Sequence, residues 1–429
     1  MKKTVAYNTL IQLVAKVISM GLTLVATILI TRALGKEGYG QFSIMQTLPA
    51  LFFILSDFGL NATALKKIYK NGNNAQSLYQ AIITIRPILS LMLIVLLNVV
   101  VAFLPYSSFL KIGVFMSSFW ILTQSLFSGT NLIFQYKQRY DLASIGYITG
   151  SVLTTLLVYG FIKLGLDVRF LSFSYVLGGL ATFVVNAYIL TKHGFSTRLT
   201  FNIFSDKKTL STLLSGSIPL GLMFVFSQIN FKADGILLSL LNLPARFNLS
   251  NIDAVAIYAL PYKVFEVSLA VPTFIMNASY PVFVARLQQS RQSLNAVLLK
   301  TIRLTTLLGL VASIMLVIFA PLAIAVLGGA QFGQSVQVLK ILGVGLFMFY
   351  ITQPLAYYLV TIEKQKILPV VYFIGAVFNV VANVLFIPKY SFYASAYITW
   401  LSEGLILLLL GFFVVKNWKG GQREVNQGC

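Results

Sequence analysis

The sequence of 429 residues is poor in the residue types that build disulfide frameworks and metal centres. It contains one cysteine, Cys429, and one histidine, His193. A single cysteine cannot support a disulfide framework or a cysteine-based metal site, and an isolated histidine lacks the second ligand that a zinc site needs. We therefore expect no metal centre and no prosthetic group.

Charged residues are also scarce, and acidic residues are the scarcer of the two kinds. Asp, Glu, Lys and Arg make up 10% of the chain, against 58% hydrophobic residues, and only 11 acidic residues face 32 basic ones. Soluble domains are roughly half apolar and one quarter charged, so this composition excludes an ordinary soluble fold. The net charge of +21 is spread between apolar runs rather than gathered in one patch, which argues against nucleic-acid binding.

The apolar residues form long uninterrupted runs. Crossing about 30 Å of hydrocarbon takes about 20 residues of helix. Runs of this length without apolar/polar alternation predict helices and disfavour an outer-membrane barrel. The twelve expected spans are 8–31, 40–63, 82–104, 109–133, 143–163, 170–190, 212–241, 253–283, 304–327, 336–360, 367–387 and 392–415.

Basic residues in the loops predict the orientation of these spans. Twenty lie on the side of the N-terminus and seven on the other side. Because short cytoplasmic loops are rich in Lys and Arg, both termini are expected in the cytoplasm. The first apolar run is interrupted by polar residues and has no small-residue cleavage site after it, so we expect a retained helix rather than a signal peptide.

The longest internal connection divides the chain into halves. We expect an N-lobe at 1–195, a cytoplasmic hinge loop at 196–211, a C-lobe at 212–415 and a cytoplasmic tail at 416–429. Two six-helix lobes of parallel topology are typical of transporters, whose binding site lies at the lobe interface near the middle of the membrane.

Ionisable residues inside the spans are the candidate site residues. Each costs about 2.5–3.5 kcal/mol on insertion scales, so such residues face a cavity or a partner. Cations suit the phosphates of a substrate, whereas acidic and amide groups suit a coupling ion or a polar cavity wall. The candidates for substrate binding are Lys16, Arg86, Lys232 and Lys263, and those for coupling or cavity contacts are Asp57, Asp234, Glu266 and Asn379.

Three of these candidates lie in the first half, and each has an alternative role. Lys16 is either a cationic wall for phosphate or a side chain that extends to the membrane surface. Arg86 offers a planar fork for phosphate oxygens, or serves as a basic anchor at the inner edge of its helix. Asp57 is either a site for a coupling proton or sodium ion, or the partner of Lys16 or Arg86.

Spacing constrains the candidates of the second half. Lys232 and Asp234 are two residues apart, so their side chains point to different sides of one helix. Lys263 and Glu266 are three apart and can pair on one face, which favours mutual neutralisation over a substrate contact. The two glycines Gly343 and Gly345 lack the strand context of a nucleotide loop and indicate close helix packing.

Several motifs resemble those of a known family. The run RALGKEGYGQF at 32–42 resembles the R-x-L-G-x-x-x-Y-G-x-F/Y signature of Wzx-like polysaccharide flippases of the multidrug/oligosaccharidyl-lipid/polysaccharide exporter superfamily. A second match has Asn379, Asn383 and FIPKY at 386–390, which is similar to the family's N-x-x-x-N-x-x-L-I-P-x-Y-G segment.

The resemblance covers the whole chain in length, helix count and motif order, with two departures. Ser391 and Phe392 stand where the family has glycine and its neighbour, and Ala394, Ser395 and Ala396 stand where it prefers G-A-A. Asp234 in the seventh span and Glu403 in the last also match the family pattern.

This resemblance implies a fold, a substrate and partners. The fold is an all-α integral membrane protein in which twelve helices form two six-helix lobes around a central cavity, as in MATE transporters. The implied function is to flip an undecaprenyl-diphosphate-linked oligosaccharide, an O-antigen or other surface polysaccharide repeat unit, across a bacterial inner membrane. It also implies coupling to protons or sodium, contact with membrane lipid, and a polysaccharide polymerase and a chain-length regulator as partners.

Rival functions remain open. A peptidoglycan lipid-precursor flippase usually carries two further C-terminal helices, and a multidrug/cation antiporter would prefer acidic cavity residues. A membrane glycan polymerase or ligase needs a catalytic loop outside the membrane, and no expected outer loop exceeds about a dozen residues. We therefore expect a transporter rather than an enzyme.

Overall fold

A computed structural model describes residues 2–71, 75–196 and 207–418. Within these residues every regular element is a helix. Residues 197–206 of the predicted hinge loop and residues 419–429 of the predicted tail lie outside the described residues, so both assignments stay predictions.

The chain separates into two compact units, Met1–Val225 and Phe226–Cys429. Both units contain part of one helix, α7 (Lys207–Leu240). Because this helix continues from the first unit into the second, its residues contribute to the core of both.

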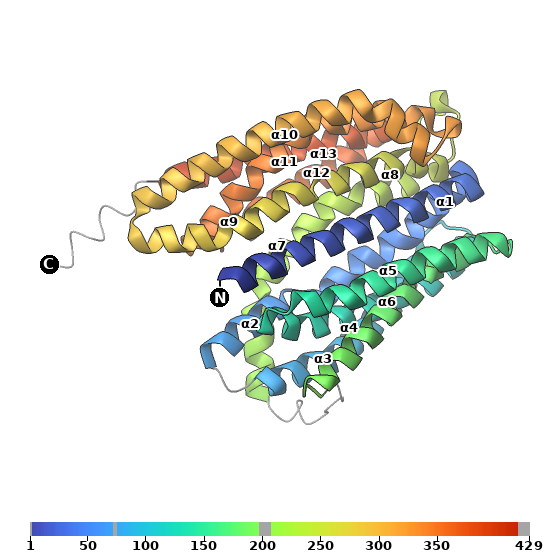
Figure 1. The fold of residues 1–429 in the computed structure, drawn as a ribbon. Coiled ribbons are helices and arrows are strands. Elements are labelled where there is room, and N and C mark those ends of the chain that lie inside the picture. Colours follow the sequence, from blue (N-terminus) through green and yellow to red (C-terminus); the bar gives the residue numbers. More distant parts are fainter. Residues whose placement is uncertain (1, 72–74, 197–206, 419–429) are drawn as a thin grey trace. The chain divides into compact units, whose positions relative to one another are not determined.

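Six further helices build the first unit, and most of them run side by side (Figure 1). They are α1 (Lys2–Asp57), α2 (Leu60–Asn71), α3 (Ala75–Phe103), α4 (Ser108–Lys137), α5 (Tyr140–Lys163) and α6 (Val168–Lys192). Helix α4 packs on α3 and α6, and α5 packs on α1 and α6. Small residues allow these contacts: a Cβ on Gly150 would come within 1.9 Å of the Thr182 hydroxyl.

Helix α1 contains two membrane spans. Its apolar part, Ile11–Leu65 with α2 included, has 55 residues, which at 1.5 Å per residue is far longer than the hydrocarbon layer. The helix is broken at Gly35, where φ is 66° and ψ is −162°. Only glycine adopts this conformation readily, so Gly35 marks the break between the two spans. Figure 1 shows helix α1 and its neighbours.

A second break in the first unit was not predicted. Helix α1 ends at Asp57, and Phe58 and Gly59 follow with φ angles of 29° and 72°. The predicted span 40–63 runs across this break, so the span is divided between the end of α1 and the start of α2. Helix α2, which follows it, buries Ala64 and Ile68 against α3, α4 and α7.

The second unit contains the remaining helices. They are α8 (Asn251–Ser268), α9 (Ala270–Gln289), α10 (Arg291–Leu327), α11 (Gly333–Thr361), α12 (Ile367–Tyr390) and α13 (Phe392–Lys416), with short 3₁₀ turns η2 (Ala245–Phe247) and η3 (Ala330–Phe332). Helix α11 is central, since it packs on α8, α9, α10 and α13. The predicted span 253–283 is divided between α8 and α9 at Leu269, and Pro272 follows in the first turn of α9, where its missing N–H costs little.

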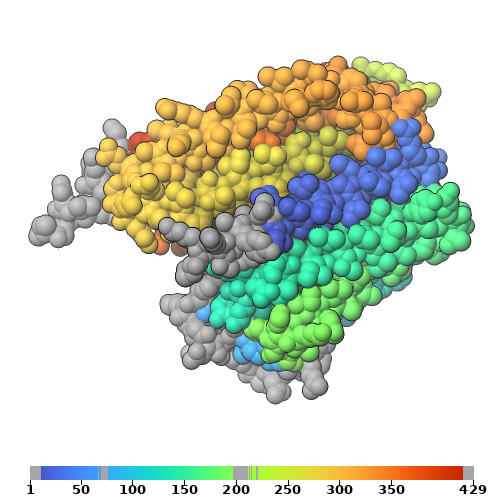
Figure 2. Space-filling view, viewed as in Figure 1, coloured from blue at the N-terminus to red at the C-terminus, as the bar shows by residue number. Residues whose placement is uncertain are grey.

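The structure confirms an all-α membrane protein with twelve spans. In the described part of the chain ten segments are long and apolar enough to cross a membrane; the first contains two spans, and α7 completes the set. The surface agrees with this assignment: the outer face of α10, in orange in Figure 2, exposes Leu307 at 61%, Ile318 at 63% and Leu322 at 60%. Apolar residues this exposed along a whole helix belong in contact with lipid.

Candidate functional site

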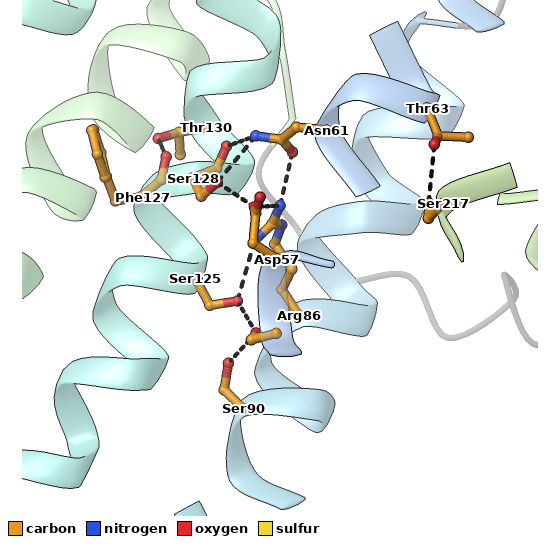
Figure 3. A network of polar contacts seen from close by, with 11 residues as sticks. Asp57, Asn61, Thr63, Arg86, Ser90, Ser125, Phe127, Ser128, Thr130 and Ser217 are labelled. Atoms are coloured by element: carbon orange, nitrogen blue, oxygen red, sulfur yellow. Dashed lines mark hydrogen bonds and ion pairs between the residues drawn. The ribbon is translucent and has the colours of Figure 1, made fainter. Parts of the chain in front are cut away.

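An ion pair between Arg86 and Asp57 organises the polar interior of the first unit (Figure 3). Nη2 of Arg86 on α3 donates to Oδ1 of Asp57 at 2.7 Å and to Oδ1 of Asn61 at 2.8 Å. Asp57 is the last residue of α1 and Asn61 lies in the first turn of α2, so one guanidinium bridges the break between these helices.

Serine hydroxyls of α4 extend this network. Ser128 donates to Oδ1 of Asp57 at 2.8 Å, and its carbonyl and hydroxyl accept from the amide of Asn61. Ser125 accepts from Arg86 and hydrogen-bonds Ser56 at 2.7 Å (Figure 3). These polar contacts join α2, α3 and α4 to the end of α1.

The placement of Arg86 selects between the roles left open by the sequence. Its side chain is 0% exposed, whereas that of Asp57 is 30% exposed. Arg86 is therefore the partner of Asp57, and in this structure its guanidinium is enclosed by protein. The role of Arg86 in substrate binding stays a prediction.

A second charged cluster, Lys232, Lys263 and Glu266, lies in the second unit. Nζ of Lys232 on α7 contacts Oε1 of Glu266 on α8, and Nζ of Lys263 lies 3.6 Å from Oε2 of the same carboxylate. The pairing of Lys263 with Glu266 follows from their spacing, but the contact from Lys232 joins two helices and could not be derived from spacing. The three side chains are 24%, 39% and 27% exposed, so a cluster of net charge +1 is partly open.

Asp234 lies at the centre of a third, fully enclosed network. Its Oδ2 accepts from the hydroxyls of Tyr258 on α8 at 2.5 Å and Thr399 on α13 at 2.8 Å. Its Oδ1 accepts from Nδ2 of Asn383 on α12 at 2.8 Å. Asp234 is 0% exposed, and Asn379 and Asn383 are as well. As the spacing predicts, Lys232 and Asp234 face different partners.

The chemistry of this third network suits a small hard cation. The hydrogen-bond partners of Asp234 among the described residues are neutral hydroxyls and amides, so these contacts do not neutralise its charge. A buried carboxylate is expensive unless it takes up a proton or pairs with a cation. The side-chain oxygens of Asn379 and Asn383 add to those of Asp234, and oxygen donors are the ligands that hard cations prefer.

The other predicted residues are placed as follows. Lys16 is partly exposed on the first half of α1, beside buried Ala15. Asn379 belongs to the Asp234 network, because its backbone and side-chain oxygens accept from Asn383. Glu403 is 4% exposed and accepts from Thr352 of α11.

Sequence reasoning identified Asn379 and Asn383 but missed most of the other neutral members of both networks. Asn61, Ser128, Tyr258 and Thr399 are each common residue types in this chain, and their roles depend on contacts between helices distant in sequence. One signal was available: Ser395 and Thr399 are four apart and lie on one face of α13, where both bond into the Asp234 network.

Comparison with known protein families gives two matches to this sequence. The family described as "Polysaccharide biosynthesis protein" matches residues 5–288, and the MatE family matches residues 247–385. A search of curated protein sequences finds no significant match.

Solved structures share the fold. An inward-facing MATE multidrug resistance transporter of the MOP superfamily is 14% identical with a TM-score of 0.77, over 97% of this chain and 99% of that one. The lipid II flippase MurJ is 16% identical with a TM-score of 0.75, over 95% and 89%. A MOP superfamily transporter from Pyrococcus furiosus is 15% identical with a TM-score of 0.67, over 99% and 96%.

These likenesses define the class of protein by its fold: a multi-pass, all-helical membrane protein with the MATE-like fold. At identities of 14–16% they concern the fold alone. The family match covers most of the chain, and the protein belongs to the polysaccharide biosynthesis protein family.

Proposed function

We propose that this protein is a flippase that carries an undecaprenyl-diphosphate-linked oligosaccharide, such as an O-antigen repeat unit, from the inner to the outer leaflet of a bacterial cytoplasmic membrane. The family match supports a role in polysaccharide biosynthesis, and the fold is shared with a flippase of another lipid-linked precursor. The excess of basic residues on one side supports two cytoplasmic termini. The protein works by alternating access, without catalysis, beside a polymerase and a chain-length regulator.

The partly open cluster of Lys232, Lys263 and Glu266 carries this proposal. A diphosphate brings negative charge into the membrane, and two ammonium groups near one carboxylate leave one positive charge to receive it. Glu266 holds both ammonium groups in place before the substrate arrives. Tyr262 is buried beside them, with its ring 5.9 Å from Nζ of Lys232, and restrains that ammonium group without neutralising its charge.

The Asp234 network supports ion coupling. A bound sodium ion or proton would neutralise the enclosed carboxylate and favour the conformation in which Asn383, Tyr258 and Thr399 surround it. A coupling ion can drive a transport step only through such a difference in affinity between two conformations. Asp57 in the first unit is the second candidate for this role, because its carboxylate is partly exposed.

A reconstituted assay tests the transport proposal. Full-length protein in liposomes should move a fluorescent undecaprenyl-diphosphate oligosaccharide between leaflets, measured as the fraction bleached by dithionite added outside. Lys232→Gln and Lys263→Gln should each slow movement about tenfold or more, because each removes a charge-assisted contact of about 1.5–3 kcal/mol. Lys300→Gln is the matched control, since Lys300 is an exposed lysine of the same unit.

The same assay distinguishes the rivals. Faster movement of lipid II than of the oligosaccharide lipid would favour the peptidoglycan-precursor function. Uptake of a lipophilic cation with no movement of either lipid would favour a drug antiporter.

Ion coupling is tested separately by thermal unfolding in detergent. Sodium chloride should stabilise the wild type relative to choline chloride at equal ionic strength, and Asp234→Asn should abolish the difference. Glu37→Gln, which alters an exposed carboxylate in the first unit, should keep it. If sodium has no effect on the wild type at any pH, the proton becomes the coupling ion to test.

A further inference from the structure

A basic cavity lies where three membrane spans end in the first unit. It has a volume of 220 Å³, and its polar lining comes from Lys137, Arg139 and His193. Lys137 is the last residue of α4, Arg139 precedes α5 and His193 follows α6. Because these spans end together, the cavity is at the level of the membrane surface rather than in the hydrocarbon.

The charges around the cavity are unbalanced. Arg139 is held by Asp141, through Nε at 2.9 Å and Nη2 at 2.9 Å, so these two charges cancel. At these helix ends the positive charges of Lys137 and Lys192 are then left over. The His193 ring can donate a further hydrogen bond. The cavity and its rim therefore favour an anion.

Aromatic rings hold one of these cations at the opening. Nζ of Lys137 lies 5.6 Å from the centre of the Phe195 ring and 5.2 Å from that of Tyr136. Such contacts restrain a long flexible side chain without neutralising its charge. Nζ of Lys192 lies 4.7 Å from the ring of Tyr188 in the same way.

The inner wall of the cavity is apolar. Ile133 and Leu190 line it, and both are 1% exposed residues of the core. Leu142 adds a partly buried side chain. A free inorganic anion would make no favourable contact with this apolar wall. A ligand with a phosphate at one end and hydrocarbon at the other matches both parts, and 220 Å³ is several times the roughly 30 Å³ of a water molecule.

We propose that the cavity formed by Lys137, Arg139, His193 and their apolar neighbours binds the phosphate headgroup of an anionic phospholipid. The lipid phosphate contacts Lys137 and His193, and the first carbons of its chains lie along Ile133, Leu142 and Leu190. Basic cavities at span ends are typical sites for acidic lipids.

The site is separate from the flipping function. It involves none of the residues proposed to bind the transported lipid or the coupling ion, and it belongs to the first unit alone. A resident lipid there would hold the ends of α4, α5 and α6 together. We therefore expect it to stabilise the protein rather than to be transported.

Native mass spectrometry and thermal unfolding of the full-length protein test this inference. Phosphatidylglycerol in mixed micelles should remain bound and raise the unfolding temperature, whereas phosphatidylcholine should do neither. Lys137→Gln should weaken phosphatidylglycerol binding about fivefold, the effect of one cation at a membrane surface. Lys137→Arg should restore it.

The matched control is Lys163→Gln at the opposite end of α5. Nζ of Lys163 lies 5.7 Å from the ring of Tyr159, so its chemistry resembles that of Lys137, but it does not line the cavity. Equal loss in both glutamine variants, or none in Lys137→Gln, would overturn the proposal. Equal stabilisation by inorganic phosphate alone would also overturn it, since the apolar wall would then have no role.

Discussion

Nη2 of Arg86 lies 2.7 Å from Oδ1 of Asp57, yet only one of these two charged side chains is enclosed. The guanidinium is 0% exposed and the carboxylate is 30% exposed. The charge that is left unpaired therefore differs in burial, depending on which partner is removed. Without Asp57 the remaining charge is buried, whereas without Arg86 the remaining carboxylate still reaches the surface of its unit.

This asymmetry predicts unequal effects of two neutral substitutions. Removing one partner of a buried ion pair costs about 3–5 kcal/mol. Asp57→Asn should lower the free energy of unfolding by nearly that amount, because the buried guanidinium of Arg86 cannot reach water. Arg86→Gln should lower it less. Thermal or denaturant unfolding in detergent, at one lipid content, measures both. An equal or reversed order would contradict the enclosed position of the guanidinium.

The double variant Asp57→Asn with Arg86→Gln is the control for this pair. It removes both charges and keeps amides that can hydrogen-bond Asn61 and Ser128. Its stability should exceed that of Asp57→Asn alone. If the two single effects simply add, the residues do not interact as the structure places them.

Motifs predicted some local structure, because a glycine at a fixed motif position indicates a backbone conformation that other residues adopt with difficulty. Gly35 in the run at 32–42 has a φ of 66°, so the resemblance identified a turn between two spans. Tyr39 and Phe42 of the same run are 4% and 7% exposed, which explains aromatic residues at fixed spacing after that turn. The twelve apolar runs likewise predicted twelve spans, since hydrocarbon thickness alone determines their length.

Contacts between distant helices could not be predicted in the same way. Asp234 is hydrogen-bonded to Thr399, 165 positions away in the sequence, and to Asn383, 149 positions away. The spacing of apolar residues carries no information on such contacts. The break after Asp57 was missed for a related reason: the predicted span was set by its overall apolar content, whereas the contacts of Arg86 with Asp57 and Asn61 across the break join residues distant in sequence. Local patterns therefore predict spans, whereas the polar centres depend on tertiary packing.

The Asp234 network predicts a role for a neutral hydroxyl. Thr399→Val keeps the shape of the side chain but removes the 2.8 Å hydrogen bond to Oδ2 of Asp234. Oδ2 keeps its hydrogen bond from Tyr258, but a hydrogen bond to a charged group is worth about 1.5–3 kcal/mol, so stability should fall by that amount, and sodium should no longer stabilise as strongly. Unfolding curves with and without sodium measure both effects.

Thr191→Val is the control for that substitution. Its hydroxyl bonds only the carbonyl of Ala187 in its own helix, at an exposed site. It should change neither stability nor the sodium effect by more than about 0.5 kcal/mol. A loss as large as that of Thr399→Val would show that valine itself, and not the lost contact with Asp234, is responsible.

Helix packing in the second unit gives a third prediction. A Cβ on Gly345 of α11 would come within 2.0 Å of Cβ of Trp400 on α13, and neither atom can turn away. Gly345→Ala should therefore cost about 1–3 kcal/mol through overpacking. Gly411→Ala is the matched control, because a Cβ at Gly411 meets nothing within 4 Å.

In that control the helix propensity of alanine acts alone. Gly411→Ala should leave stability unchanged or raise it by about 0.5–1 kcal/mol. Opposite signs for the two variants, read from unfolding midpoints, are the expected result. Equal effects would mean that α11 and α13 do not approach as closely as the structure shows.

The departure from the family pattern at Ser391 gives the last prediction. Ser391 joins α12 to α13 with φ of 54° and ψ of −140°, a conformation that glycine adopts readily and other residues reach only with strain of about 1–3 kcal/mol. Its hydroxyl is buried and has no hydrogen-bond partner among the described residues. Ser391→Gly should therefore stabilise the protein by about 1 kcal/mol, after the entropy that glycine adds to the unfolded chain is subtracted.

Ser391→Ala separates the two sources of that gain. Alanine removes the buried hydroxyl but keeps a Cβ, so the backbone strain stays. The difference in unfolding free energy between the glycine and alanine variants then measures the strain alone. A glycine variant no more stable than the alanine variant would show that serine is accommodated here without strain, and that the glycine of the family motif serves another purpose.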